Sequence, residues 1–267
     1  MLSTAASNQT TPQCVCGNSR FSTVFTYTQP PPGETRFEFS AVGRYYREVL
    51  RCMQCGHFVS IHDMDLSGLY SSEYVASTYG NSGIQRNFDR IISLPAERSD
   101  NTGRVKRINA FASERLTLPA REHRQPSVLD IGSGLCVFLH LMKKAGWQCT
   151  AIDPDPRMVR HACEVVGVHG VCGDFMELQN LGLFDLITFN KVLEHVQDPV
   201  AMLAKSRQFL RKGGLVYVEV PDGEAAAKDG QGREEFFIEH RHIFSLASMN
   251  ILALKAGFKS FAVERLQ

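Results

Sequence analysis

The chain of 267 residues has little excess charge of either sign and no long apolar run. Its 29 Lys and Arg residues nearly balance 28 Asp and Glu residues, so it lacks the basic surplus of proteins that bind many phosphates. This balance does not favour nucleic acid as a partner. No apolar stretch approaches the roughly 20 residues that span a bilayer, so we expect no membrane association.

A secretory signal is also missing. The N-terminal segment MLSTAASNQTTPQ has neither a basic n-region nor an apolar h-region, so we expect a cytoplasmic protein whose residues 1–13 form a disordered tail. With 43% hydrophobic residues, the chain is long enough for one main domain and a small accessory unit.

Short apolar runs rich in Val, Ile, Thr and Phe alternate with helical-length stretches in the second half of the chain. The runs are SVLDI (127–131), QCTAID (148–153), HGVCG (169–173), FDLITFN (184–190) and LVYVEV (215–220). This pattern predicts an α/β fold, a doubly wound parallel sheet with helices on both faces, over residues 125–267. Asp155-Pro156 and Asp198-Pro199 predict helix starts, and Arg211, Lys212 and Gly213 are expected to end the second helix.

The segments before residue 125 and after residue 245 have other patterns. Residues 14–68 contain short strand-like pieces and predict a cysteine-rich lobe, whereas residues 69–124 have helical character and predict a linker or lid. After a helix around 246–256 we expect one final strand, FKSFAVERL (258–266). The uncovered edge of that strand would permit pairing with a second chain, so a homodimer is a further hypothesis.

The stretch VLDIGSGLCVFL (128–139) places an acid at a strand end, followed by two glycines and a helix start. Gly132 and Gly134 permit a tight turn and close approach of a ligand at the carboxyl edge of the sheet. The dinucleotide fingerprint would need glycine in place of Val137, and Asp130 would repel a diphosphate. Asp130 suits an ammonium group instead.

The next strand ends complete this ligand pattern. Asp153 is placed to accept hydrogen bonds from ribose hydroxyls. Asp174 offers a carboxylate to an exocyclic amine, and Phe175 offers a ring face to adenine. Asn190 is expected to contact the same ligand or to hold its loop. Ammonium, ribose and adenine without phosphate describe S-adenosylmethionine (SAM).

The motifs DIGSG, AIDPD, GDF, FDLITFNKVLEHVQDP and GGLVYVEVPD follow one another over about half of the chain. In this order they resemble class I SAM-dependent methyltransferases, which implies a Rossmann-like sheet and an enzyme. The family pattern usually has a third glycine where this chain has Cys136. The family's sheet usually ends in an antiparallel pair of strands, so a single terminal strand suggests a trimmed edge or a truncated chain.

The eight cysteines form two sets. One set lies in apolar, periodic segments and predicts small core residues: Cys136, Cys149, Cys163 and Cys172. The other forms two turn-like pairs that would converge on a structural Zn²⁺: Cys14, Cys16, Cys52 and Cys55. Because C-x-C is less regular than C-x₂-C, four reduced thiols are the alternative, and His57 or His62 could replace one ligand.

The lobe resembles the small zinc lobe, zinc-ribbon-like, that precedes the methyltransferase domain in sugar C-methyltransferases and their relatives from antibiotic and surface-polysaccharide pathways. The similar segment is RCMQCGHFVSIHDMDLSGLYSSEY (51–74). The resemblance implies that the lobe helps to build the substrate pocket.

Methyl transfer needs alignment of the acceptor and a base that removes its proton. Glu194 and His195 follow the fourth strand, where the acceptor should lie, and either act directly or shape the pocket. The segment FFIEHRHIFS (236–245) resembles the part that supplies acid and base groups in the sugar C-methyltransferases. His240 is therefore the first choice of general base, with Glu239 orienting it or sharing the role.

Two functions follow from these patterns. The leading hypothesis is a SAM-dependent methyltransferase that acts on a small-molecule acceptor, a sugar nucleotide or a related biosynthetic intermediate, at carbon or oxygen. The alternative is a non-catalytic binding or scaffold protein, a zinc lobe on a degenerate methyltransferase fold. The retention of Asp130, Asp153 and Asp174 favours the enzyme.

Overall fold

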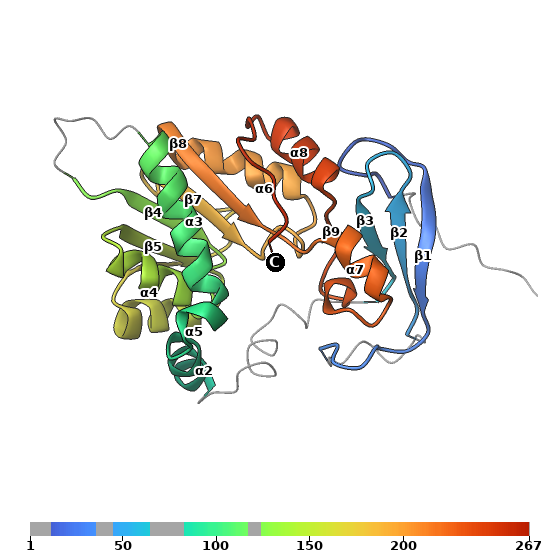
Figure 1. The fold of residues 1–267 in the computed structure, drawn as a ribbon, viewed down its shortest axis with the longest axis horizontal. Coiled ribbons are helices and arrows are strands. Elements are labelled where there is room, and N and C mark those ends of the chain that lie inside the picture. Colours follow the sequence, from blue (N-terminus) through green and yellow to red (C-terminus); the bar gives the residue numbers. More distant parts are fainter. Residues whose placement is uncertain (1–11, 36–44, 65–82, 117–123, 267) are drawn as a thin grey trace, which may run out of the picture.

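The computed structural model describes residues 12–35, 45–64, 83–116 and 124–266. Its larger sheet has five parallel strands in the order β6-β5-β4-β7-β8 (Figure 1). They are β4 (Ser127–Ile131), β5 (Gln148–Asp153), β6 (His169–Cys172), β7 (Phe184–Asn190) and β8 (Leu210–Glu219). This confirms the predicted doubly wound sheet. No helix in the described residues is both long and apolar enough to cross a membrane.

Helices cover both faces of this sheet. One face packs against α2 (Gly83–Ile92), α3 (Asp100–Arg115), α4 (Val137–Lys144) and α5 (Pro156–His161), and the other against α6 (Pro199–Lys205) and α8 (Leu246–Lys255). Because successive side chains of a strand point to opposite faces, Val128 belongs to the first cluster and Leu129 to the second. Asp155 and Asp198 cap α5 and α6 as expected.

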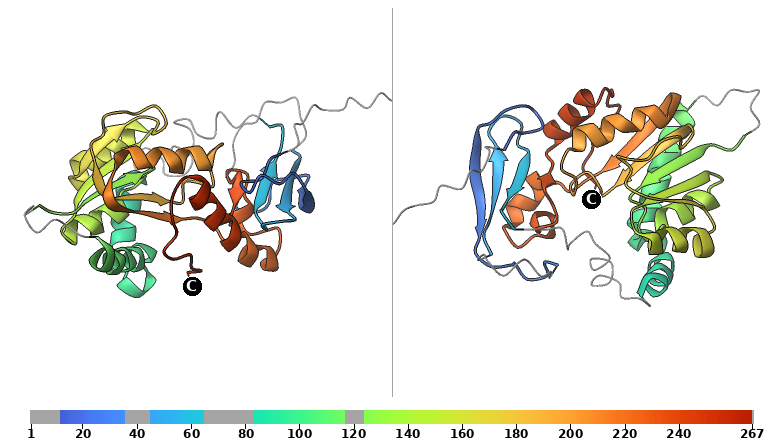
Figure 2. Two further views of the ribbon diagram at one scale, coloured as in Figure 1. Left: turned by 90° about the horizontal axis from the view of Figure 1, so that it is seen from above. Right: turned by 180° about the vertical axis from the view of Figure 1, so that it is seen from behind.

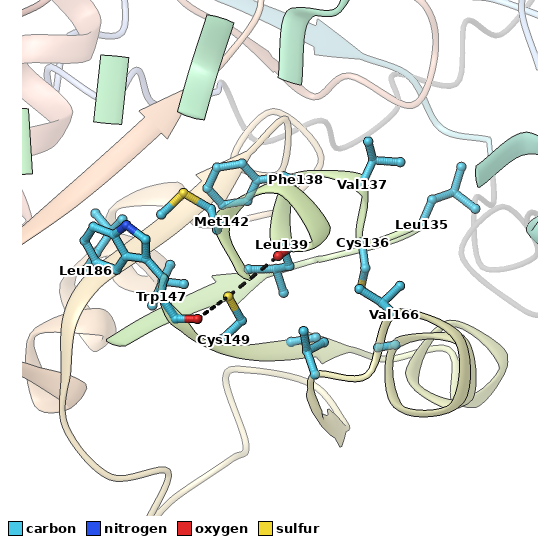
Figure 3. Close-up of a cluster of buried hydrophobic side chains, with 14 of the residues drawn as sticks. Leu135, Cys136, Val137, Phe138, Leu139, Met142, Trp147, Cys149, Val166 and Leu186 are labelled. Atoms are coloured by element: carbon cyan, nitrogen blue, oxygen red, sulfur yellow. Dashed lines mark hydrogen bonds between the residues drawn. The ribbon is translucent and has the colours of Figure 1, made fainter. Parts of the chain in front are cut away.

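The cluster around α4 is fully apolar at its centre. Leu139 and Met142 are completely buried, and the Cys149 thiol donates to the backbone oxygens of Leu139 and Trp147 at 3.6 and 3.5 Å (Figure 3). Cys149 and Cys136 are thus core residues, as predicted. Cys163 and Cys172 are exposed, so the prediction was wrong for these two.

The smaller sheet is antiparallel and has the order β1-β2-β3-β9. Three strands come from the N-terminal part: β1 (Phe21–Tyr27), β2 (Arg47–Cys52) and β3 (Phe58–Ile61). The fourth, β9 (His242–Ile243), follows α7 (Gly223–Asp229) in the insertion after β8. In both views of Figure 2 this insertion, in orange, lies between the blue strands and the larger sheet. The lobe is therefore completed by residues from the far end of the chain.

Two predicted elements differ in the structure. Residues 258–266 form no strand: Phe261 is 61% exposed, and Arg265 pairs with Asp222 and Glu224 instead of joining the sheet. The proposed homodimer edge therefore loses its basis. The helix that begins at Pro199 ends at Lys205, because the chain tightens into a 3₁₀ turn that buries Phe209 and then enters β8. Arg211, Lys212 and Gly213 thus lie in that strand.

Part of the sequence-based assignment falls outside the described residues. This concerns residues 1–11 of the predicted tail and the LYSSEY segment (69–74). Within the predicted linker, α2 and α3 confirm the helical character, and Ser99 caps α3 by accepting from the Thr102 amide.

Candidate cofactor, acceptor and metal sites

The glycine turn between β4 and α4 has the backbone that only glycine adopts easily. Gly132 and Gly134 have φ of +67° and +48°. A Cβ on Gly132 would lie 2.8 Å from Val192 Cγ2, whereas one on Gly134 would meet nothing within 4 Å. Gly134 therefore leaves room for a ligand. Cys136 also has a positive φ of 56°, which explains why glycine is usual at this position.

Asp130 forms a buried, hydrogen-bonded pair with Asn190. The Thr188 hydroxyl and the Asn190 amide donate to Asp130 Oδ1 at 2.6 and 2.8 Å. Burial raises the pKa of Asp130 to about 6. Asn190 Oδ1 is buried without a hydrogen-bond partner among the described residues. A carboxylate beside an unpartnered amide oxygen fits an incoming ammonium group.

Sequence reasoning missed Thr188. It is the polar residue within the stretch LITF (186–189), and the register of β4 on β7 sets it directly beside Asp130. That interruption of the apolar run was the available signal.

The other predicted cofactor residues have different surroundings. Asp153 is buried and accepts from the Gly134 and Asp155 amides, both at 2.9 Å. Asp174 is exposed just after β6 and accepts from the Met176 amide at 2.8 Å. Phe175 is only 3% exposed and packs against core rings. Its ring thus packs into the core, and the predicted adenine contact stays a prediction.

A second cluster lies where the loop after β7 meets the insertion. Ligand atoms of Glu194, His195 and His240 lie within 4.8 Å of one another, a spacing that a divalent cation would also fit. Burial raises the pKa of Glu194 to about 8, and neither carboxylate oxygen has a hydrogen-bond partner among the described residues. Glu194 is therefore a neutral acid near pH 7.

The two histidines have defined tautomers. His195 Nδ1 lies 2.9 Å from the Glu239 backbone oxygen, and His240 Nδ1 lies 3.0 Å from that of Glu235. Because a carbonyl only accepts, each Nδ1 carries the proton and each Nε2 carries a lone pair. Burial lowers the pKa of His195 to about 4 and lowers that of His240. Both rings are therefore neutral near pH 7, with a lone pair on Nε2.

Of the two roles predicted for Glu239, orienting His240 is not seen, and sharing the role of the base stays a prediction. We expected it to orient His240, but the Glu235 backbone oxygen does so, since it lies one turn before His240 in the insertion. Glu239 orients His195 through its backbone, and its carboxylate accepts from the Thr35 hydroxyl at 3.5 Å.

The four N-terminal cysteines come together as predicted. Cys14 and Cys55 sulfurs are 3.4 Å apart, Cys16 and Cys52 sulfurs 3.6 Å, and all four lie within 4.8 Å. Sulfurs around a tetrahedral zinc ion are about 3.8 Å apart, so the cluster fits this ion. His57 is not part of the cluster, because its ring nitrogens contact His242 and Ser248.

Known proteins resemble this chain over the larger sheet. A family model described as a methyltransferase domain matches residues 104–263. The ubiquinone biosynthesis O-methyltransferase of Xanthomonas campestris pv. campestris is 29% identical over 152 residues, which cover 54% of this chain and 64% of that protein. The matched stretch thus spans less than two thirds of the relative.

Solved structures are more distant. A SAM-dependent methyltransferase of Thermotoga maritima, described as a possible histamine N-methyltransferase, is 23% identical, with a TM-score of 0.48 and coverage of 66% of this chain and 79% of the other. The N-methyltransferase NodS of Bradyrhizobium japonicum, solved with S-adenosyl-L-homocysteine (SAH), is 16% identical, with a TM-score of 0.42 and coverage of 63% and 84%.

Proposed function

The chain belongs to the methyltransferase domain family, as a class I SAM-dependent enzyme, and we propose that it methylates a hydroxyl group or an acidic carbon of a small molecule. The observation that carries this proposal is the pair of neutral histidines beside Glu194, close to the strand end that holds Asn190. Family membership favours the enzyme over a non-catalytic scaffold.

SAM would supply an electrophilic methyl group. Asp130 and Asn190 would hold its ammonium group, Asp153 its ribose and Asp174 its exocyclic amine, with Gly132 and Gly134 shaping the turn. The unpartnered Asn190 oxygen and the open side of Gly134 support this assignment.

At the acceptor, Nε2 of His195 or His240 would take the proton. Neutral Glu194 would hydrogen-bond the acceptor oxygen and keep its charge out of the pocket. A sugar nucleotide or a related intermediate is our proposed acceptor, supported by the likeness of the lobe and the insertion to those of sugar methyltransferases. We also propose that Cys14, Cys16, Cys52 and Cys55 hold one structural zinc ion, which would stabilise the lobe.

Calorimetric titration with SAM and SAH tests the cofactor site. Asp130→Asn should weaken binding strongly, because an amide cannot balance the ammonium charge. Asp185→Asn is the matched control, a buried aspartate at the opposite end of the same sheet. Failure of folded protein to bind SAM would refute the proposal. Labelled SAM would then be offered with sugar nucleotides as acceptors.

A further inference from the structure

A buried ion pair in the lobe reaches the insertion that carries Glu239 and His240. Arg47 of β2 is completely buried, and its Nη2 lies 2.8 Å from Glu34 Oε1. Tyr45 donates its hydroxyl to Glu34 Oε2 at 2.5 Å and accepts from Arg47 Nε at 3.2 Å. The Arg47 guanidinium also stacks over the Tyr27 ring, 4.1 Å from its centre. The pair is thus held from several sides.

Both charged groups also bind the backbone of the insertion. Glu34 Oε1 accepts from the Ile238 amide at 2.8 Å, and Arg47 Nη1 donates to the Phe236 oxygen at 2.5 Å. Phe236 and Ile238 are themselves completely buried. The ion pair therefore fixes the position of the backbone immediately before Glu239.

The backbone carbonyl of Glu239, the residue after Ile238, orients His195. The Glu239 oxygen accepts from His195 Nδ1, and the rings of His195 and His240 lie 4.9 Å apart. A shift of the insertion by 1 Å would break this hydrogen bond and free the ring to take the other tautomer.

We propose that Glu34 and Arg47 are positioning residues of the acceptor site: through Phe236 and Ile238 they hold the Glu239 carbonyl where it keeps the proton of His195 on Nδ1. This inference rests on the proposed function, in which Nε2 of His195 or His240 takes the proton of the acceptor. The buried pair acts through the backbone of Phe236 and Ile238.

Nitrogen NMR of the full chain with ¹⁵N-labelled histidine tests this inference directly. The His195 signals, assigned with His195→Gln, should show the Nδ1–H form at pH 7 in the wild type. In the double variant Glu34→Gln/Arg47→Met, which removes both charges at similar volume, they should shift towards the Nε2–H form. The measurement needs no acceptor.

Arg124 and Asp185 provide a matched control. They form another partly buried ion pair, at the amino end of β7, and Arg124→Met/Asp185→Asn should lower stability without changing the His195 tautomer. SAM affinity should be unchanged in both double variants. If the Glu34/Arg47 variant does not fold, Arg47→Lys carries the test, because lysine keeps the charge but lacks the guanidinium fork.

The outcomes separate the two proposals. A folded Glu34/Arg47 variant that keeps the Nδ1–H form of His195 would overturn the positioning role, whatever the result with SAM. Absence of SAM binding in the wild type would instead refute the proposed function. With a sugar nucleotide that serves as acceptor, the positioning role predicts for the Glu34/Arg47 variant a kcat about 10²-fold lower and an unchanged KM for SAM. This is the cost typical of a 1 Å misplacement.

Discussion

His195 Nδ1 lies 2.9 Å from the backbone oxygen of Glu239, and this contact joins the loop after β7 to the insertion after β8. It leaves the lone pair of the neutral ring on Nε2. The segment that completes the lobe's sheet thereby also sets the tautomer of a residue on the loop that follows a strand of the larger sheet.

Removal of either base should reduce turnover but not cofactor binding. His195→Gln and His240→Gln should each lower kcat by about 10²-fold or more, the usual contribution of a positioned acid or base. Affinity for SAM, measured by calorimetry, should not change. His169→Gln, at an exposed position on β6, is the control. Equal activity of all three variants would exclude both histidines as bases.

Glu194 should make the protein less stable as pH rises. Its pKa is about 8 when folded and near 4.5 when not buried, so between these values the folded state keeps a proton that the unfolded state has lost. The difference corresponds to about 5 kcal/mol as an upper value. Glu194→Gln should remove this loss, as measured by urea denaturation from pH 5 to 8. Parallel pH curves for variant and wild type would contradict the assignment.

Glu219 should have the opposite effect on stability, which it should increase as pH rises. Burial alone would raise its pKa, but hydrogen bonds and charge from Arg104, with the Tyr217 hydroxyl, bring it below the usual value. The charged form is therefore the stabilised one above the unfolded pKa. Glu219→Gln should lower the free energy of unfolding at pH 7 and lose this effect in acid.

The two glycines of the turn should differ in their effects. Gly132→Ala places a methyl group against Val192 and should destabilise the fold by about 1–3 kcal/mol or more, seen as a lower melting temperature. Gly134→Ala meets no protein atom, so it should cost about 1–2 kcal/mol of backbone strain and mainly weaken SAM binding. If Gly134→Ala left SAM affinity unchanged, the ligand would not approach this side of the turn.

Zinc should bind the N-terminal cysteines and support the lobe. Elemental analysis should find one zinc ion per chain, lost in Cys14→Ser and kept in Cys163→Ser, whose residue is exposed and outside the cluster. Loss of zinc should lower the melting temperature. SAM affinity should persist, because the glycine turn belongs to the other sheet. Zinc retained by Cys14→Ser would contradict the assignment.

The sequence by itself determined the larger sheet and the cofactor end of the site. Strand periodicity, the Asp-Pro helix starts and the glycine turn are encoded within a few residues, so they could be interpreted locally. Asp130 and Asp153 stand at strand ends, and parallel strands bring such ends to one edge. The paired cysteine turns likewise predicted their own convergence.

Only the tertiary structure decided what surrounds the acceptor. Glu34 meets Ile238 across 204 positions in sequence, and Arg47 meets Phe236 across 189, distances over which no local pattern carries information. Phe175 packs against Phe189 and Phe209, which come from other elements, so its own stretch of sequence could not predict these contacts. The proton on His195 was set in the same way, by a carbonyl that the fold brings from another segment.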